Sequence, residues 1–385
     1  MKKIATAFNS FLVLCFFSAQ LFAAPVLIPA APKLAATAYI LIDADTGKVL
    51  VANNENKRIP PASLTKLMTS YISAYEIGKG NIGVDDLALV SEKAWRTPGS
   101  RMFIREGTQV KVSDLLKGII IQSGNDASVA MAEHVAGSEG AFADLMNQHA
   151  QLLGMQNSHF INATGLPAEG HYTSAADLAL LARAIIKGFP DHYGTYSEKY
   201  FTYNKIRQPN RNKLLWRDKS VDGLKTGHTD AAGYCLVTSA KRKGMRLISV
   251  VMGTRSEESR AQESQKLLAY GFRYYESLEL YKAGEVLNQA KVWAGLKDNI
   301  QLGTVEPVAI TIPRGQSKAL SVSLDLDKTI TAPVVEGARY GSINISLNGE
   351  TLLDSPVVAL ESVEPAGLIK RIWHSIVLFF LGLIG

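Results

Sequence analysis

Three short segments of the chain carry side chains that together can perform nucleophilic catalysis. They are Ser63-Leu64-Thr65-Lys66, Ser123-Gly124-Asn125 and Lys225-Thr226-Gly227-His228. A serine hydroxyl is a weak nucleophile at neutral pH and needs a base beside it. Lys66 can act as that base only where burial or a neighbouring cation lowers its pKa. We therefore expect Ser63 to be the nucleophile and Lys66 its base.

The patterns around these segments predict the elements that position them. Pro60-Pro61 precede apolar residues at helical spacing, so Ser63 is expected near a helix N-terminus with Lys66 one turn further on the same face. Lys225 is expected on a strand beside this helix, as the cation that lowers the pKa of Lys66. Further helices are predicted over 113–122, with Ser113 as cap, and over 126–135, 139–153, 174–187 and 256 to about 277. Strands are predicted over 223–228, 234–240 and 246–252.

The three segments, in this order, are the set found in penicillin-binding proteins and class A β-lactamases. The chain resembles the low-molecular-mass penicillin-binding proteins over nearly its whole length, and most closely the D-alanyl-D-alanine carboxypeptidases of the penicillin-binding protein five and six type. The resemblance implies an α/β sandwich, with a mainly antiparallel sheet flanked by helices, and a small C-terminal β-rich domain. It also implies removal of the terminal D-alanine from peptidoglycan pentapeptides through an acyl-enzyme on Ser63, with β-lactam antibiotics as covalent inhibitors.

The resemblance also implies roles for other residues in the chemical steps. Ser123 is the third expected catalytic residue and relays a proton to the leaving amine. Asn125 orients the substrate amide and Lys66. The backbone N–H groups of Ser63 and His228 bind the oxyanion of the tetrahedral intermediate, where losing one donor typically costs about 10²–10³ in rate.

Recognition of the substrate C-terminus requires a fixed cation. In the resembling family an arginine downstream of the Lys-Thr-Gly segment has this role, and Arg260 stands at that place, with Arg255 as the competitor. Thr226 is expected to hydrogen-bond the same carboxylate. Gly227 is expected to leave the strand bare so that a peptide can lie against it.

Two other functions stay open at this point. A β-lactamase of the same fold needs a glutamate that activates the deacylating water. No Glu-x-x-Leu-Asn lies between Asn125 and Lys225, and Glu169 stands in the different context Pro-Ala-Glu-Gly-His. The third alternative is an acylatable scaffold in which the β-rich domain and the C-terminal tail have the main role. An endopeptidase is a variant of the first hypothesis.

The composition and the remaining motifs exclude several classes of function. The net charge is +6, but the basic residues are scattered, and no basic run with interleaved aromatics predicts nucleic-acid binding. The histidines lack metal-ligand spacing and no phosphate-binding loop is present, so neither a metal nor another cofactor is expected. Cys235 is expected to be a buried small side chain.

The two ends of the chain predict export and a membrane contact. Residues 1–24 have the positive start, apolar stretch and small residues of a signal peptide. A linker over 25–35, a peptidase domain over 36–279 and a β-rich domain over 280–365 follow, the last with an expected protein partner. Residues 366–385 form an amphipathic helix too short in apolar residues to span a bilayer, so we expect it to lie on the periplasmic face of the inner membrane.

Overall fold

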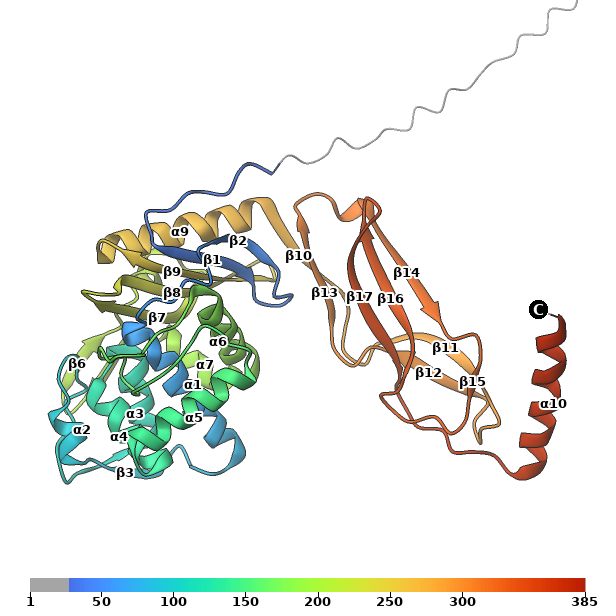
Figure 1. The fold of residues 1–385 in the computed structure, drawn as a ribbon, viewed down its shortest axis with the longest axis horizontal. Helices are drawn as coiled ribbons and strands as arrows, with labels where there is room; N and C mark the ends of the chain where they lie inside the picture. Colours follow the sequence, from blue (N-terminus) through green and yellow to red (C-terminus); the bar gives the residue numbers. More distant parts are fainter. Residues whose placement is uncertain (1–27, 385) are drawn as a thin grey trace, which may run out of the picture.

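The computed structural model describes residues 28–384, which form two domains and a separate C-terminal helix (Figure 1). The signal peptide expected over 1–24 lies outside the described residues. The first domain has helices on both faces of one sheet, and the second is built of strands (Figure 1). The fold class expected from the sequence is therefore confirmed.

The sheet of the first domain has five strands in the order β2-β1-β9-β8-β7, and every neighbouring pair is antiparallel. Strand β7 lies at one edge, which leaves one side of its backbone without a neighbouring strand of this sheet. The strands are β1 (Ala38–Asp43), β2 (Val49–Asn53), β7 (Val221–Thr229), β8 (Gly233–Arg242) and β9 (Met245–Thr254).

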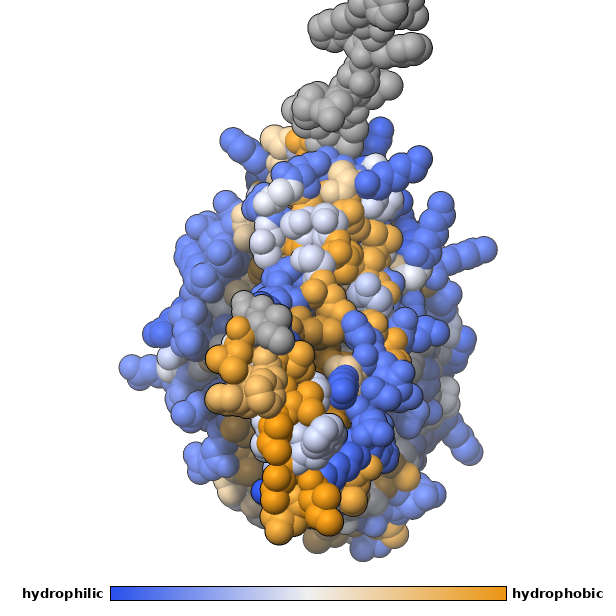
Figure 2. All heavy atoms as spheres, turned by 90° about the vertical axis from the view of Figure 1, so that its right-hand side faces the viewer, coloured by the Kyte–Doolittle hydropathy of each residue, from blue (hydrophilic) through white to orange (hydrophobic). Residues whose placement is uncertain are grey.

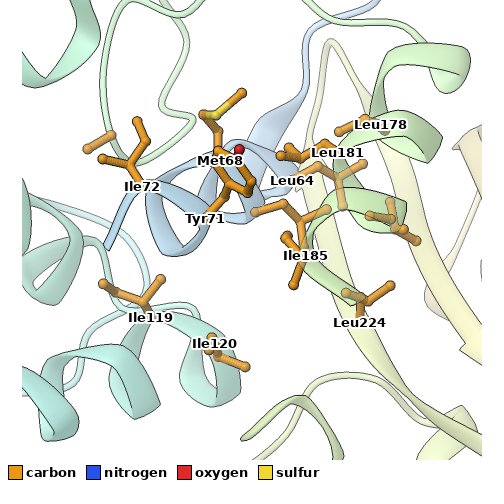
Figure 3. Packing of buried hydrophobic residues seen from close by; sticks show 14 of the residues in the cluster. Leu64, Met68, Tyr71, Ile72, Ile119, Ile120, Leu178, Leu181, Ile185 and Leu224 are labelled. Atoms are coloured by element: carbon orange, nitrogen blue, oxygen red, sulfur yellow. The ribbon is translucent and has the colours of Figure 1, made fainter. Parts of the chain in front are cut away.

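Alternate side chains of β1 enter two different cores, as expected for a strand covered on both faces. Ile40 and Ile42 belong to a large cluster with α1, α4 and α6, whereas Tyr39 and Leu41 pack with α9. Figure 3 shows the large cluster around α1. The helices are α1 (Thr65–Lys79), α2 (Glu92–Arg96), α3 (Val112–Lys117), α4 (Asn125–Ala136), α5 (Glu139–Leu152), α6 (Ala175–Gly188), α7 (Pro190–Tyr193), α8 (Leu214–Arg217) and α9 (Glu257–Tyr274).

Two short hairpins complete the first domain. They are formed by β3 (Leu87–Leu89) with β4 (Gln109–Lys111), and by β5 (Tyr200–Tyr203) with β6 (Ile206–Pro209). Neither hairpin joins the central sheet.

Two helices of the structure differ from those predicted from the sequence. The helix expected over 113–122 is α3 followed by a π-helical turn, η2 (Gly118–Gln122), and Ser113 lies inside α3, whose N-cap Lys111 makes no side-chain cap. The helix expected to about residue 277 ends at Tyr274. There the chain becomes β10, because its backbone pairs with β13 of the second domain, a partner that local periodicity does not reveal.

The second domain has a six-stranded sheet in the order β14-β16-β17-β12-β11-β15, beside the pair β10-β13. Its core is formed by buried aliphatic side chains such as Ile300, Ile312 and Ile345. The strands are β10 (Tyr275–Tyr281), β11 (Val286–Trp293), β12 (Asn299–Gly303), β13 (Val308–Pro313), β14 (Leu320–Leu326), β15 (Ile330–Thr331), β16 (Arg339–Leu347) and β17 (Glu350–Ala359).

A buried carboxylate joins the two domains. Asp43, at the end of β1, accepts hydrogen bonds from Thr311 at 2.9 Å and from Ser277. The backbone N–H of Asp45 also donates to it, at 2.8 Å. Because these donors come from both domains, the carboxylate fixes the start of the β-rich domain against the end of β1 in the first sheet.

The C-terminal helix α10 (Leu368–Ile384) forms polar contacts with the second domain in its first half. His374 Nδ1 accepts a hydrogen bond from the backbone of Ala294 at 2.7 Å, and Lys370 pairs with Asp298 at 2.8 Å. Beyond these contacts large apolar side chains are exposed along the helix (Figure 2). Within residues 28–384, no helix combines the length and hydropathy needed to cross a bilayer.

Candidate active site

The proposed nucleophile and its base lie on one turn at the start of α1. Ser63 is in the short 3₁₀ turn η1 (Ala62–Leu64), and Lys66 is only 1% exposed. Lys66 Nζ lies 3.2 Å from Ser63 Oγ, 2.7 Å from Asn125 Oδ1 and 2.6 Å from the carbonyl oxygen of Thr164. The sequence prediction that these two side chains meet is confirmed in the structure.

The partners of Lys66 determine where the lone pair of its neutral form points. A neutral amine has two N–H donors and one lone pair. Asn125 Oδ1 and the Thr164 carbonyl are acceptors at the two shorter distances and take the two hydrogens. The lone pair is then left for the hydroxyl hydrogen of Ser63, which is the arrangement a base requires.

The pKa of Lys66 is lowered from 10.5 to about 7, first by burial and then by the positive charge of Arg211, while Asp126 opposes the shift. We expected Lys225 to supply that charge. Lys225 is itself buried, and burial, together with Lys66, Arg211 and Arg260, holds its pKa well below the usual range. Arg211, which lines the cleft and donates to the carbonyl of Gln122, is the cation whose charge lowers the pKa of Lys66.

The second motif is held in place by an unusual backbone. The π-helical turn η2 is followed by Ser123 in the left-handed region, at φ 68°. Asn125 then begins α4, and its Nδ2 donates to the carbonyl of Pro98 at 2.6 Å, which turns Oδ1 toward Lys66. The buried hydroxyl of Ser123 has no hydrogen-bond partner in the part of the chain that the structure describes.

Asp126 holds the loop over 98–104 that forms one wall of the site. Its carboxylate accepts hydrogen bonds from the backbone of Met102 and Phe103, each at 2.8 Å. The carbonyl of Ser100, in the same loop, accepts from the backbone of Asn125 at 2.7 Å. The second motif and this loop are therefore built as one unit.

The third motif lies on the edge strand β7, against the turn that carries Ser63. A Cβ on Gly227 would lie 3.0 Å from the carbonyl oxygen of Pro61 and 3.1 Å from Leu64. Glycine therefore favours the close approach of the strand to the turn, and the bare strand expected for a bound peptide stays a prediction. Lys225 Nζ donates to the carbonyl of Thr226 at 3.1 Å, and the exposed ring of His228 stacks on Tyr234 at 3.9 Å.

The three motifs meet in a polar cleft of about 240 Å³. The cleft is lined by Ser63, Ser100, Ser123, Arg211, Thr226, Gly227, His228, Tyr234, Glu257 and Arg260. Arg260 is 5% exposed and donates to the carbonyl of Gly227 at 3.2 Å. Arg255 is exposed and outside this lining, so of the two candidate arginines only Arg260 lies at the site.

Sequence reasoning missed four groups that the structure brings to the site. These are Arg211, Ser100, Asp126 and the carbonyl of Thr164. Asp126 directly follows the second motif, and this adjacency is the one signal that points to it. The others reach the site from loops with no local pattern, so only the tertiary structure places them.

Cys235 and the histidines other than His228 are not part of the lining of this cleft. Cys235 is buried, as expected, and burial raises the pKa of its thiol to about 11. His171 is buried near the nucleophile's turn: its Nε2 lies 2.9 Å from Thr65 Oγ1, and Nδ1 accepts from the backbone of Ile161 at 3.2 Å. Within residues 28–384, no three His, Cys, Asp or Glu side chains gather as a metal site would require.

Comparison with known proteins agrees with this geometry. Residues 26–256 match the family model of D-alanyl-D-alanine carboxypeptidases, and residues 275–365 match the C-terminal domain of penicillin-binding protein 5. The chain is 44% identical to D-alanyl-D-alanine carboxypeptidase DacC of Escherichia coli strain K12 over 375 residues, 95% of this chain and 94% of that protein.

Solved structures show the same relationship. Penicillin-binding protein 5 from Haemophilus influenzae has a TM-score of 0.81 and 40% identity, covering 87% of this chain and 99% of that chain. Penicillin-binding protein 6B from Escherichia coli has a TM-score of 0.73 and 37% identity, covering 86% of this chain and 98% of that chain. Since the family model spans more than half of the chain and the relatives span nearly all of it, the chain belongs to the serine-type D-alanyl-D-alanine carboxypeptidase family of penicillin-binding proteins.

Proposed function

We propose that this protein removes the C-terminal D-alanine from peptidoglycan pentapeptides through an acyl-enzyme on Ser63, and that penicillins acylate the same hydroxyl. The observation that carries the proposal is the environment of Lys66. Its two short hydrogen bonds leave the lone pair of Nζ for Ser63 Oγ, which lies 3.2 Å from Nζ. Its pKa of about 7 makes the neutral form available.

Acylation begins when Lys66 Nζ takes the hydroxyl proton as Ser63 Oγ attacks the carbonyl carbon between the two D-alanines. The oxyanion that forms is bound by the backbone N–H groups of Ser63 and His228, which both line the cleft. The C–N bond then breaks, and the proton passes from Lys66 through Ser123 to the departing amine. Lys66, neutral again, takes a proton from a water whose oxygen attacks the ester carbonyl carbon. When the bond from that carbon to Ser63 Oγ breaks, Lys66 returns the proton to Oγ, and the shortened peptide leaves.

Recognition of a free C-terminus comes from the arginine end of the cleft. Arg260 is nearly buried, so a carboxylate placed beside it would be partly desolvated, which strengthens the pairing. Thr226 lies in the same lining and offers a hydroxyl, and Arg211 adds a second positive charge. A fixed carboxylate site favours carboxypeptidase over endopeptidase action.

The activity is tested by incubating the protein with a peptide ending in D-Ala-D-Ala and measuring D-alanine release. Ser63→Ala should abolish both release and covalent labelling by fluorescent penicillin, with the label mapped to Ser63 by mass spectrometry. A long-lived adduct supports the peptidase, whereas rapid penicillin turnover would favour the β-lactamase. No D-alanine release by the wild-type protein would refute the proposal.

The carboxylate site has its own test. Arg260→Gln should raise KM for the peptide, while Arg255→Gln, at an exposed position outside the cleft, should have no effect. If both variants behaved alike, the assignment of Arg260 would be wrong.

We also propose that the protein is exported and that α10 holds it on the periplasmic face of the inner membrane. Leu368, Ile369, Ile372, Trp373, Ile376, Phe379, Phe380, Leu381 and Leu383 are all large, apolar and exposed on this helix. Burial in a lipid interface removes that apolar surface from water, and Lys370 and Arg371 favour anionic headgroups.

Sedimentation with vesicles containing anionic phospholipid tests the anchor. The full chain should bind, and Ile372→Asp with Phe379→Asp should release it without changing D-alanine release in solution. Equal sedimentation of both proteins would contradict the role of α10. A protein partner of the β-rich domain stays a prediction.

A further inference from the structure

A carboxylate of the protein itself lies at the cationic end of the polar cleft. Glu257 is part of the cleft lining, together with Arg211 and Arg260. One of its carboxylate oxygens lies 2.8 Å from Lys213 Nζ, and the other lies 3.9 Å from the guanidinium of Arg260. The side chain of Glu257 is 51% exposed, so it faces both the cleft and the solvent. A negative charge therefore stands beside the cations that would receive a substrate carboxylate.

The charge of Glu257 is present near neutral pH. The hydrogen bond from Lys213 lowers the pKa of Glu257, and the charges of Arg260 and Arg211 lower it further, while burial opposes the shift. The arginines feel the same interaction, because burial lowers the pKa of each and the charge of Glu257 opposes that shift. Glu257 therefore neutralises part of the positive charge at this end of the cleft.

Arg260 does not need Glu257 to hold its position. Its guanidinium donates to the carbonyl of Gly227 at 3.2 Å and lies 5.6 Å from the centre of the Tyr234 ring. The separation of 3.9 Å from Glu257 is too long for a hydrogen bond. Glu257 thus acts on Arg260 through its charge, and glutamine at this position would remove the charge while Arg260 keeps its other partners.

Glu257 also lies in the first turn of α9, where a carboxylate is favoured by the positive end of the helix dipole. Glu258 shares this position, but its two oxygens pair with Arg217 at 2.8 and 2.7 Å, and it is not part of the cleft lining. The two neighbours therefore serve the helix alike, and only Glu257 can act on a bound carboxylate at close range.

We propose that Glu257 is a specificity-determining residue, an internal counter-anion that weakens the binding of carboxylates beside Arg260. A free C-terminus that enters the cleft meets the attraction of Arg260 and the repulsion of Glu257 together, so its advantage over a neutral C-terminus is reduced. The same repulsion weakens the binding of the released D-alanine. The inference rests on the proposed function, because it concerns the carboxylate site of the same substrate.

Two peptides that differ only in the charge of the C-terminus test this role. One ends in D-Ala-D-Ala with a free carboxylate, and the other is its C-terminal amide. Glu257→Gln should raise kcat/KM for the free acid about two- to fivefold at low ionic strength, through a lower KM, because exposed charges interact modestly. The values for the neutral amide should not change. The gain should shrink in about 0.5 M salt, because screening weakens the repulsion.

Product binding gives a second measurement that needs no peptide cleavage. D-alanine should slow the labelling of Ser63 by fluorescent penicillin, used well below saturation. The D-alanine concentration that halves the labelling rate should be about two- to fivefold lower in Glu257→Gln than in the wild-type protein. Equal concentrations for the two proteins would contradict the proposal.

Glu258→Gln is the matched control, because it removes an equal charge from the same turn of α9 outside the cleft lining. It should behave like the wild-type protein in both assays, and the melting temperature of each variant shows whether it is folded. An equal gain in Glu258→Gln would overturn the proposal, because the effect would then be a diffuse surface potential.

The remaining outcomes separate the role of Glu257 from the activity itself. A higher KM for the free acid in Glu257→Gln would show that Glu257 orients the cations, and an equal gain for the amide would show that charge is not the cause. Either result would overturn the proposal and leave the carboxypeptidase intact. If the wild-type protein cleaved neither peptide, the proposed function would fail and this inference with it.

Discussion

The rate of acylation of Ser63 should depend on pH through the titration of Lys66. Its pKa is lowered to about 7, so the neutral base is present above pH 7 and is lost as pH falls through that value. The rate constant should therefore drop about tenfold per pH unit below pH 7 and level off above it, because protonation of one group changes the base concentration tenfold per unit.

The gain in neutral base at pH 7 follows from comparing the pKa of the buried Lys66 with that of an ordinary lysine. With the usual pKa of 10.5, only about 3 in 10⁴ Lys66 side chains would be neutral at pH 7. With a pKa of about 7, roughly half are neutral. The burial of Lys66 and the charge of Arg211 therefore increase the fraction of active base roughly 1,500-fold at pH 7.

The assay is the rate of covalent adduct formation with excess benzylpenicillin, followed by intact-protein mass spectrometry from pH 5 to 10. Arg211→Gln should move the inflection to higher pH, because it removes a positive charge that lowers the pKa of Lys66. Arg255→Gln removes an exposed arginine outside the cleft and should leave the inflection in place.

Two results would refute this reasoning. A rate that is flat from pH 6 to pH 9 would show that deprotonation of Lys66 does not limit acylation. An inflection near the ordinary lysine value, with no shift in Arg211→Gln, would show that burial does not make Lys66 a base at neutral pH. The inflection is informative even if Arg211→Gln also weakens penicillin binding, since binding changes the amplitude and not the pKa.

Three further predictions concern residues around the nucleophile and the core. Gly165→Ala should lower both the melting temperature and the acylation rate, since its Cβ would clash with the carbonyl oxygen of Ala62. Gly170→Ala, at a similar φ but with no atom closer than 3.8 Å to the new Cβ, should cost only about 1–2 kcal/mol in the free energy of unfolding. His171→Leu should slow acylation and His171→Gln should restore it, because glutamine can both donate and accept a hydrogen bond; equal loss in both variants would contradict this. Cys235 should resist thiol reagents at pH 8 until the protein unfolds, because the pKa of its buried thiol is about 11; fast labelling of the native protein would contradict its burial.

The local pattern of the chain was sufficient for the elements that carry the chemistry. The apolar spacing after Pro60-Pro61 predicts α1, and Ser63 and Lys66 meet because residues three apart in such a turn share one face. The strand-like pattern after Gly223 predicts the strands β7, β8 and β9, since such a pattern is also a property of neighbouring residues. The polar and apolar distribution in α10 likewise predicts a helix with a large exposed apolar surface.

Other features depended on partners far away in the chain, and local pattern carries no information about them. The helix α9 ends at Tyr274 because β13 pairs with the next residues, and η2 is a π-helical turn that ends with Ser123 in the left-handed region. Arg260 and Arg255 have the same chemistry and nearly the same place in the sequence. Only the packing of α9 against β8 and β9 brings one of them to the cleft and leaves the other exposed.

The motif residues by themselves determined the class of reaction, because a serine, a lysine and a carboxylate-binding cation limit the chemistry that is available. The tertiary structure decided whether Lys66 can act as a base. Its pKa depends on how completely it is removed from water and on a charge brought close by a distant loop, that of Arg211. Both are set by contacts between segments that lie far apart in the sequence, and for that physical reason residue types and spacing do not reveal them.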